Sequence, residues 1–332
     1  MKTDLRQFWC SLTKYTLTVL LLGLLAGCAM TPPGRGSELT QDSMTLKTEA
    51  ALGKSAYLQA IQKNGGIYQD PELGDFVSAV GQRLVRHNQR PEHKFSFAVI
   101  NDSAPNAFAF PGGYVAITRG LLAVLSTESE LATILGHEIG HVTAKHCLQG
   151  IEYEAFSEAV TDKKGELADS AVYGLLASSA DGFAAKLIDT RYSLEQEFES
   201  NRLSIDMLVK AGYAPNGALQ VHELFYAELE KAANTDWLNG FFRKHPSSKE
   251  RLSVNRRYID EHYPLVTGEG QDVIAFARAI ISLTLTRQGY STYDMARRLE
   301  QKGRLAEAIN LYHYALLEAP DEPLIMSSLG LA

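Results

Sequence analysis

The sequence predicts an α+β fold that is predominantly helical and contains a small antiparallel sheet. Apolar residues recur at helical spacing within residues 41–90, whereas three short runs between residues 95 and 118 have the pattern of strands. Two capping boxes, at residues 127–130 and 193–196, mark the starts of two further helices. We therefore expect one group of strands packed among many helices.

Length and composition exclude several classes of protein. The chain has 332 residues, 39 acidic against 32 basic side chains, a formal charge of −7 and an apolar fraction of 45%. This length allows one large domain or two smaller ones, and the apolar fraction excludes a disordered chain. Three cysteines are too few for a disulfide-stapled scaffold. The acidic balance predicts no nucleic-acid partner, and no apolar run reaches the length of an ordinary membrane-spanning helix.

The expected strands follow a helix that starts at Asp70-Pro71. Its apolar stripe consists of Leu73, Phe76, Val77, Val80 and Leu84. Residues 95–100 form the first expected strand, residues 106–113 a second extended piece with a tight turn, and residues 114–118 a third strand. The simplest arrangement of the three is a small antiparallel sheet.

Helices account for most of the remaining chain. The capping box Thr127-Glu-Ser-Glu130 predicts a helix that runs to about His146, and Ser193-Leu-Glu-Gln196 predicts one that ends near Gly212. Between them, the Ala-rich residues 151–190 are also expected to be helical.

The N-terminus has the features of a targeting segment. Residues 1–16 are net basic, residues 17–25 form a short apolar run, and small residues follow at Ala26-Gly27. This order predicts a secretory signal peptide over residues 1–27. The run is too short to span a bilayer comfortably.

The four residues Leu25-Ala-Gly-Cys28 resemble the bacterial lipoprotein lipobox. The resemblance implies that Cys28 is acylated and becomes the first residue of the mature chain, with residues 28–44 as a lipid-anchored linker. Ala29 rather than Asp follows, which by the same resemblance implies an outer-membrane lipoprotein that faces the periplasm of a Gram-negative bacterium. The alternative is a plain signal peptide with an incidental cysteine.

The motif His137-Glu-Ile-Gly-His141 lies inside the helix that begins near residue 127. Four residues make slightly more than one helical turn, so both imidazoles leave the same face about 6 Å apart along the axis and could bind one zinc ion. Glu138 projects about 100° around the helix, where it could reach a water beside the metal. The alternative is a buried histidine pair that neighbouring groups satisfy.

A third protein ligand is needed. A histidine six residues after His141 would complete one common pattern, but Cys147 occupies that position and His146 is one residue out of register. We therefore interpret His146 as a surface residue or one that contacts a ligand from behind. A glutamate on a later helix is the alternative ligand.

Helix phase selects that glutamate. The expected buried stripe of the helix that begins at Ser193 is formed by Leu194, Phe198, Ile205 and Leu208. Glu197 and Asn201 fall on this stripe, whereas Glu195 and Glu199 fall on the solvated face. A carboxylate that points into a core needs a cation, so Glu197 is the predicted ligand. Asn201, one turn later, is predicted to hydrogen-bond a ligand histidine.

Several ordered motifs resemble the M48 (Ste24-type) zinc metallopeptidase family. They are His137-Glu-Ile-Gly-His141, Glu197-Phe-Glu-Ser-Asn201, Asn106-Ala-Phe-Ala-Phe-Pro-Gly-Gly113, Thr118-Arg-Gly-Leu-Leu122 and His245-Pro-Ser-Ser-Lys-Glu-Arg251. The resemblance implies a zincin-like metallopeptidase core over residues 45–265, with a sheet edge that binds an extended peptide by strand addition. The family usually has Asp where this chain has Asn201.

The resemblance also assigns roles to individual residues. It implies one Zn²⁺ per chain held by His137, His141 and Glu197. Glu138 would take a proton from the attacking water and pass it to the leaving amine. His245 and Arg251 would lie beside the transition state, although in some periplasmic members the corresponding histidine caps the zinc and holds the enzyme latent. The alternative is that His245 belongs to a turn and Arg251 to a solvated helix face.

A helical tail over residues 271–332 follows a break at residues 266–270. One tetratricopeptide-like (TPR) repeat, over about residues 289–322, is predicted by the offsets of Gly303, Ala308, Tyr312, Ala315 and Pro320. Leu329-Gly330 would begin an incomplete second repeat. So few repeats cannot bury their own apolar face, and we expect the tail to dock on the preceding domain. The alternative is an ordinary helical hairpin.

Together these features predict a zinc metalloendopeptidase that degrades unfolded or misassembled envelope proteins. Outer-membrane lipid, through acylated Cys28, and an assembly-machinery protein, through the tail, are the expected partners. One alternative is a latent or inactive zinc-fold chaperone or scaffold. Another is an unrelated thermolysin-like peptidase, which is disfavoured because His141 and Glu197 lie far apart in the sequence.

Overall fold

The computed structural model describes residues 46–148, 187–188, 191–231, 245, 249–266 and 273–332. The predicted signal peptide, the linker with Cys28 and most of the Ala-rich segment lie outside these residues. Among the described helices, none is both long and apolar enough to cross a membrane.

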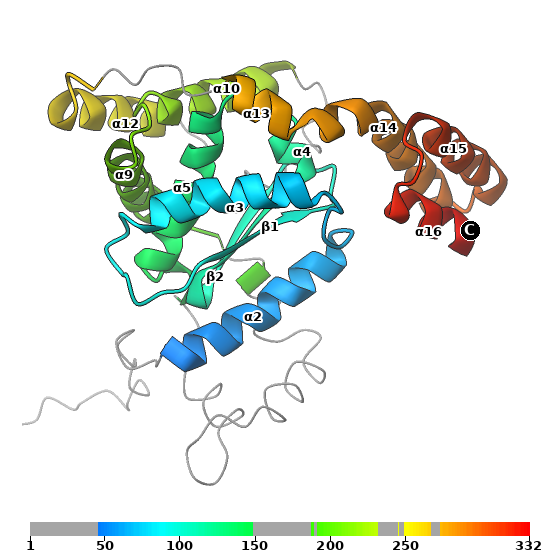
Figure 1. Ribbon diagram of the computed structural model, residues 1–332, viewed down its shortest axis with the longest axis horizontal. Helices are drawn as coiled ribbons and strands as arrows, with labels where there is room; N and C mark the ends of the chain where they lie inside the picture. Colours follow the sequence, from blue (N-terminus) through cyan, green and yellow to red (C-terminus); the bar gives the residue numbers. More distant parts are fainter. Residues whose placement is uncertain (1–45, 149–186, 189–190, 232–244, 246–248, 267–272) are drawn as a thin grey trace, which may run out of the picture. The chain divides into compact units, whose positions relative to one another are not determined.

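Helices dominate the described chain, as predicted (Figure 1). The helices are α2 (Leu46–Lys63), α3 (Pro71–Val85), α4 (Arg119–Leu122), α5 (Glu128–Thr143), α9 (Leu194–Lys210), α10 (Gly217–Lys231), α12 (Lys249–His262), α13 (Val273–Ala279), α14 (Ile281–Gln301), α15 (Leu305–Glu318) and α16 (Pro323–Leu331). The strands are β1 (Ser96–Ile100), β2 (Ala107–Phe110) and β3 (Tyr114–Thr118), and two short 3₁₀ turns are η2 (Pro111–Gly113) and η3 (His146–Leu148).

The sheet is mixed, so the prediction of an antiparallel sheet was wrong. Its strand order is β1-β3-β2, with β3 antiparallel to β2 and parallel to β1. The turn at η2, where Gly112 and Gly113 have φ of 75° and 91°, reverses the chain between β2 and β3. Because β2 also runs opposite to β1, β3 regains the direction of β1. Because β3 lies between β1 and β2, the neighbour of β1 is the strand that runs in the same direction.

Both faces of the sheet are buried. Phe108, Phe110 and Ala116 pack with α2, whereas Ala107 and Val115, on the opposite face, pack with α3 and α5. Adjacent residues of a strand face opposite sides, so a strand covered on both sides is apolar throughout. This covering explains why β2 is buried at all four positions.

Three helices begin where the sequence predicts. The Asp70 carboxylate accepts from the Leu73 backbone N–H at 3.0 Å at the start of α3. Thr127 caps α5 in the same way, and Ser193 and Gln196 form a complete capping box at the start of α9. Leu194, however, is 38% exposed and is not part of the buried stripe predicted for α9.

Helix α5 ends at Thr143, earlier than predicted, because Lys145 adopts a left-handed conformation with φ of 56°. The chain then continues into η3, which begins at His146. This turn brings His146 back toward α5 instead of extending the helix.

Helices α5 and α9 approach closely along a line of small residues. Gly136 and Gly140 of α5 face Ser204 and Ser200 of α9. The Ser204 hydroxyl donates to the Thr133 carbonyl oxygen at 3.1 Å, and the Ser200 hydroxyl donates to the carbonyl oxygen of His137. The close approach sets the position of the α9 side chains relative to those of α5.

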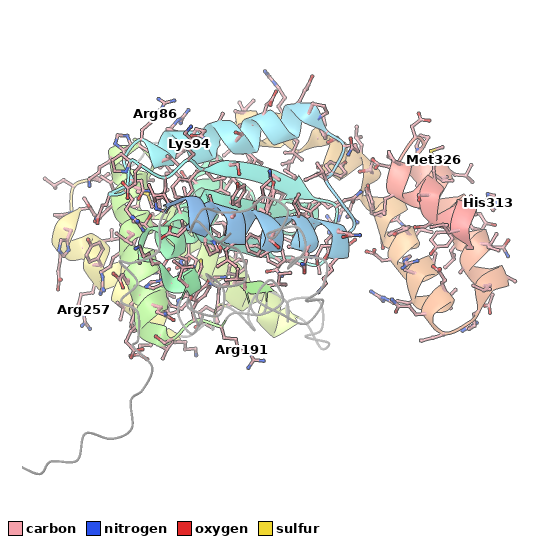
Figure 2. All side chains as sticks on the ribbon, turned by 90° about the horizontal axis from the view of Figure 1, so that it is seen from below. Arg86, Lys94, Arg191, Arg257, His313 and Met326 are labelled. Carbon is pink, nitrogen blue, oxygen red and sulfur yellow. The ribbon has the colours of Figure 1, made fainter. Side chains whose placement is uncertain are left out.

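The helical tail packs on the core, as expected. The Arg119 guanidinium lies 3.4 Å from the centre of the Tyr290 ring of α14, and the Ser282 hydroxyl donates to Asp70 at the start of α3. Within the tail, α14 and α15 lie side by side, and the Tyr290 hydroxyl donates to Glu322 at 2.5 Å. Labelled side chains such as Arg86 and Met326 are exposed (Figure 2).

Candidate metal centre

Two histidines of α5 and one glutamate of α9 meet in the core. The Nε2 atoms of His137 and His141 are 3.0 Å apart. Glu197 Oε2 lies 3.4 Å from His137 Nε2, and Glu197 Oε1 lies 3.3 Å from His141 Nε2. All three side chains are buried. The structure therefore brings together the three residues that the sequence selected as ligands.

His245 adds a fourth donor. Its Nδ1 lies 3.1 Å from His137 Nε2 and 2.9 Å from Glu197 Oε1. Its Nε2 lies 3.5 Å from a carboxylate oxygen of Glu138, the buried residue next to His137. One ligand atom from each of His137, His141, Glu197 and His245 lies within 4.8 Å of the other three.

This donor set fits a tetrahedral zinc ion. Zinc takes imidazole nitrogen and carboxylate oxygen at about 2.0–2.2 Å, so two ligand atoms of a tetrahedral site lie about 3.4 Å apart. The observed separations of 3.0–3.4 Å among the Nε2 atoms of His137 and His141 and the Glu197 oxygens are close to this value. Three imidazoles and one carboxylate are also ligands that zinc commonly selects.

The protonation states favour metal binding. Burial holds the pKa of His141 well below its usual value and lowers the pKa of His245 to about 4. Burial alone would raise the pKa of Glu197, but the neighbouring His245 and His137 hold it well below its usual value. Neutral imidazoles and an ionised carboxylate are the forms that coordinate a metal.

Arg251 holds Glu197 from the other side. Its Nη1 lies 2.7 Å from Glu197 Oε2, and its Nη2 donates to Asn201 Oδ1 at 3.0 Å. Arg251 is buried, so it does not belong to a solvated face. Asn201 is buried as predicted, but its side-chain oxygen accepts from Arg251 of α12 rather than from a ligand histidine.

The family comparison agrees with this geometry. Residues 74–258 match the family described as Peptidase family M48. This chain belongs to peptidase family M48. The M48 match covers α5, α9 and most of α12, and therefore every residue of the cluster.

Three relatives illustrate the similarity. The chain is 30% identical to the putative beta-barrel assembly-enhancing protease of Vibrio cholerae over 267 residues, which is 78% of this chain and 54% of that protein. It is 25% identical to the beta-barrel assembly-enhancing protease of Escherichia coli over 323 residues, 92% of this chain and 65% of that protein. The mitochondrial metalloendopeptidase OMA1 of Schizosaccharomyces pombe is 28% identical over 241 residues, 67% of this chain and 63% of that protein. The chain thus spans between half and two thirds of the length of these relatives.

Three further residues lie beside the M48 cluster, namely His146, Glu199 and Tyr192. His146, predicted to lie on the surface or to contact a ligand from behind, does the second: it is buried, and its Nδ1 lies 3.0 Å from His141 Nδ1. Glu199, expected to contact only solvent, lies 3.2 Å from His146 Nε2. Tyr192 stacks on the His141 ring with centroids 3.7 Å apart. Only the position of Tyr192, immediately before the Ser193 capping box, could have drawn attention to it.

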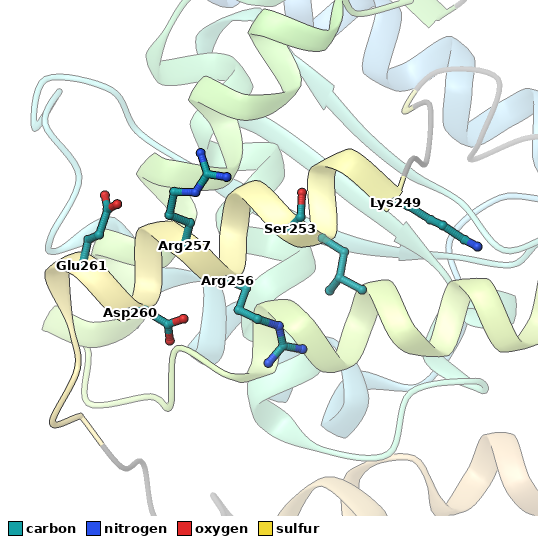
Figure 3. A pocket seen from close by; sticks show the side chains of 7 residues that line it. Lys249, Ser253, Arg256, Arg257, Asp260 and Glu261 are labelled. Carbon is teal, nitrogen blue, oxygen red and sulfur yellow. The ribbon is translucent and has the colours of Figure 1, made fainter.

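A surface depression of about 530 Å³ lies elsewhere, along α12 (Figure 3). It is lined by Lys249, Leu252, Ser253, Arg256, Arg257, Asp260 and Glu261. These residues lie on the face of α12 opposite Arg251, and they carry three basic side chains followed by two acidic ones. The depression lacks a convergent group of donors, in contrast to the M48 cluster.

Proposed function

We propose that this chain is a zinc-dependent endopeptidase of the bacterial envelope. The observation that carries the proposal is the convergence of four buried donor atoms, from His137, His141, Glu197 and His245, beside the Glu138 carboxylate. Membership of peptidase family M48 supports hydrolysis of peptide bonds as the reaction. His137, His141 and Glu197 are the proposed protein ligands of one Zn²⁺.

The chain's own residues account for the acid–base steps. A bound zinc ion supplies Lewis acidity, which polarises the scissile carbonyl and acidifies the attacking water. Glu138 follows the ligand His137 in the sequence, and its carboxylate lies beside the donor cluster, 3.5 Å from His245 Nε2. In this position the carboxylate would accept the water proton and return it to the leaving amine. Arg251 holds the Glu197 carboxylate in place through the contact at 2.7 Å. We propose that one edge of the sheet binds the substrate as an added strand.

We further propose that the resting enzyme is latent. His245 Nδ1 lies with the three ligand atoms rather than at a distance suited only to an oxyanion donor. A zinc site closed by four protein ligands has no position for water and does not hydrolyse peptides. Movement of His245 away from the other three donors would open the site, and the helical tail is the proposed place at which a partner triggers that movement.

Substrates and location follow from the relatives and the N-terminal sequence. Two relatives are named for enhancing the assembly of β-barrels, which supports unfolded or misassembled envelope proteins as substrates. The lipobox-like residues that end at Cys28 support an outer-membrane lipoprotein facing the periplasm. The TPR-like segment, residues 289–322, supports contact with an assembly-machinery protein.

The decisive experiment is digestion of an unfolded outer-membrane protein by the zinc-loaded chain, with and without a chelator. Because the resting site is proposed to be closed, the assay uses both the wild type and His245→Ala. Adding Glu138→Gln to His245→Ala should keep the zinc content but lower cleavage by about 10²–10⁴-fold. A double variant that cleaves as fast as His245→Ala alone would refute the mechanism. A zinc-loaded chain that binds unfolded protein but never cleaves it would favour the chaperone or scaffold alternative.

A further inference from the structure

The turn after α5 places a histidine behind a proposed metal ligand. Helix α5 stops because Lys145 has φ of 56°, and η3 then returns toward the helix. His146 is buried there with only 2% of its side chain exposed, and its Nδ1 lies 3.0 Å from His141 Nδ1. Its other nitrogen, Nε2, lies 3.2 Å from Glu199 Oε2 on α9.

The positions of the ring nitrogens determine which nitrogen of His141 and which nitrogen of His146 carries a hydrogen. His141 presents Nε2 to the donor cluster, so its Nδ1 must carry the hydrogen when the ring binds a metal. That N–H points at His146 Nδ1, which must then offer a lone pair. The hydrogen of neutral His146 therefore resides on Nε2, where it donates to the Glu199 carboxylate.

We propose that His146 and Glu199 are positioning residues that fix the tautomer and orientation of His141 for metal binding. A hydrogen-bond acceptor behind a ligand histidine orients the ring and raises its basicity. The proposal rests on the proposed function, since it requires that the cluster binds a metal ion.

His137 provides an internal contrast. Its Nδ1 is buried and has no hydrogen-bond partner among the described residues. Asn201, the residue expected to contact a ligand histidine, instead accepts from Arg251. Within the part of the chain that the structure describes, His141 is therefore the histidine of α5 whose Nδ1 is hydrogen-bonded, through His146, to an exposed carboxylate. We therefore expect zinc affinity to depend on His146, although His146 contacts the ligand His141 and is not itself a proposed ligand.

Glu199 and Glu195 form a matched pair for the test. Both are exposed residues of α9 separated by four positions, but only Glu199 contacts His146. The Glu199 side chain is 53% exposed, so solvent screens its carboxylate. Its contribution should be smaller than that of His146.

The experiment measures zinc affinity of the full chain by competition with a chromophoric chelator, and the visible absorption of the Co²⁺-loaded chain. His146→Leu should weaken zinc binding by about 10–100-fold and shift the Co²⁺ bands. His146→Asn places an amide oxygen near the Nδ1 position and should retain most of the affinity and the wild-type bands. Glu199→Leu should weaken binding by about tenfold or less, and Glu195→Leu should leave it unchanged.

A double variant tests whether Glu199 acts on His141 through His146. Asparagine at position 146 cannot reach Glu199 as the imidazole does, so adding Glu199→Leu to His146→Asn should cause no further loss. Two results would overturn the proposal, provided that the wild type binds zinc. One is an equal loss of zinc affinity from Glu199→Leu in the wild type and in His146→Asn. The other is a loss of zinc affinity in His146→Asn as large as in His146→Leu. A wild type that binds no zinc would overturn the proposed function and this inference together.

Discussion

The close crossing of α5 and α9 predicts that Gly140→Ala disturbs both stability and the metal centre. A Cβ at Gly140 would lie 2.5 Å from the Ser200 hydroxyl, 2.9 Å from the Ser200 carbonyl oxygen and 3.1 Å from its Cα. The hydroxyl can rotate away, but the backbone atoms cannot, so α9 must move. At Gly136 the close contact is mainly with the Ser204 hydroxyl at 2.6 Å, which a rotation relieves.

The expected magnitude follows from opposing effects. Overpacking costs about 1–3 kcal/mol, and loss of the hydrogen bond from Ser200 to the His137 carbonyl costs about 1 kcal/mol. Alanine in place of glycine within a helix stabilises the fold by about 1 kcal/mol through its higher helix propensity. Gly140→Ala should therefore destabilise the fold by about 1–3 kcal/mol. Gly74→Ala in α3 is the matched control, because its Cβ would meet nothing within 4 Å, and it should stabilise by up to about 1 kcal/mol.

Thermal unfolding with and without zinc provides the assay. Each kcal/mol shifts Tm by about 2–4 °C in a domain of roughly two hundred residues. Glu197 precedes Ser200 by three positions on α9, so a displaced helix also moves this carboxylate relative to the histidines of α5. Gly140→Ala should lower both Tm and the increase in Tm that zinc causes. A variant that melts no lower than Gly74→Ala and gains as much from zinc would refute the packing argument.

Four further outcomes are expected. Glu197→Ala should lose most bound zinc by elemental analysis, whereas Glu195→Ala should keep it; equal contents would show that the ligand was wrongly chosen. His245→Ala should raise basal proteolysis or self-cleavage, whereas a residue that only donates to the oxyanion would cause a loss of roughly 10²–10³-fold. Asn201→Asp should tighten zinc binding in chelator competition, because a carboxylate is added beside a buried cation; unchanged affinity would count against this electrostatic reasoning. Cys28→Ala should move the protein from the membrane to the soluble periplasmic fraction, and unchanged fractionation would mean that the anchor lies elsewhere.

Local rules predicted the centre of the site. The four-residue spacing of His137 and His141 depends only on helix geometry, and the phase of α9 separated buried Glu197 from exposed Glu195. The same phase argument was incomplete for Glu199. Its backbone position is solvated as predicted, but a long side chain can bend back across the helix to reach a buried partner.

Features set by tertiary contacts were not predicted. The parallel pairing of β1 with β3 depends on which strand is inserted between the others, and hydrophobic patterns carry no such information. The return of His146 depends on a left-handed conformation at Lys145, a residue type that rarely adopts it. The partner of Asn201 depends on α12, which lies about fifty residues further along the chain and whose arginine enters the core.

The uncharged side chain of Asn201 changes the net charge of the proposed metal centre. Glu138, Glu197 and Arg251 are buried, so with neutral histidines the net charge is −2 + 1 = −1, and a divalent cation makes it +1. An aspartate instead of Asn201 would bring the loaded site to zero and would hold the metal more firmly. The residual positive charge weakens metal binding but strengthens the pull on the protons of a nearby water. The hydrogen bonds behind His141 act in the opposite direction, since they raise the basicity of a ligand without adding charge to the buried site. We infer that this chain maintains metal affinity through the orientation of a ligand, where an aspartate would do so through charge.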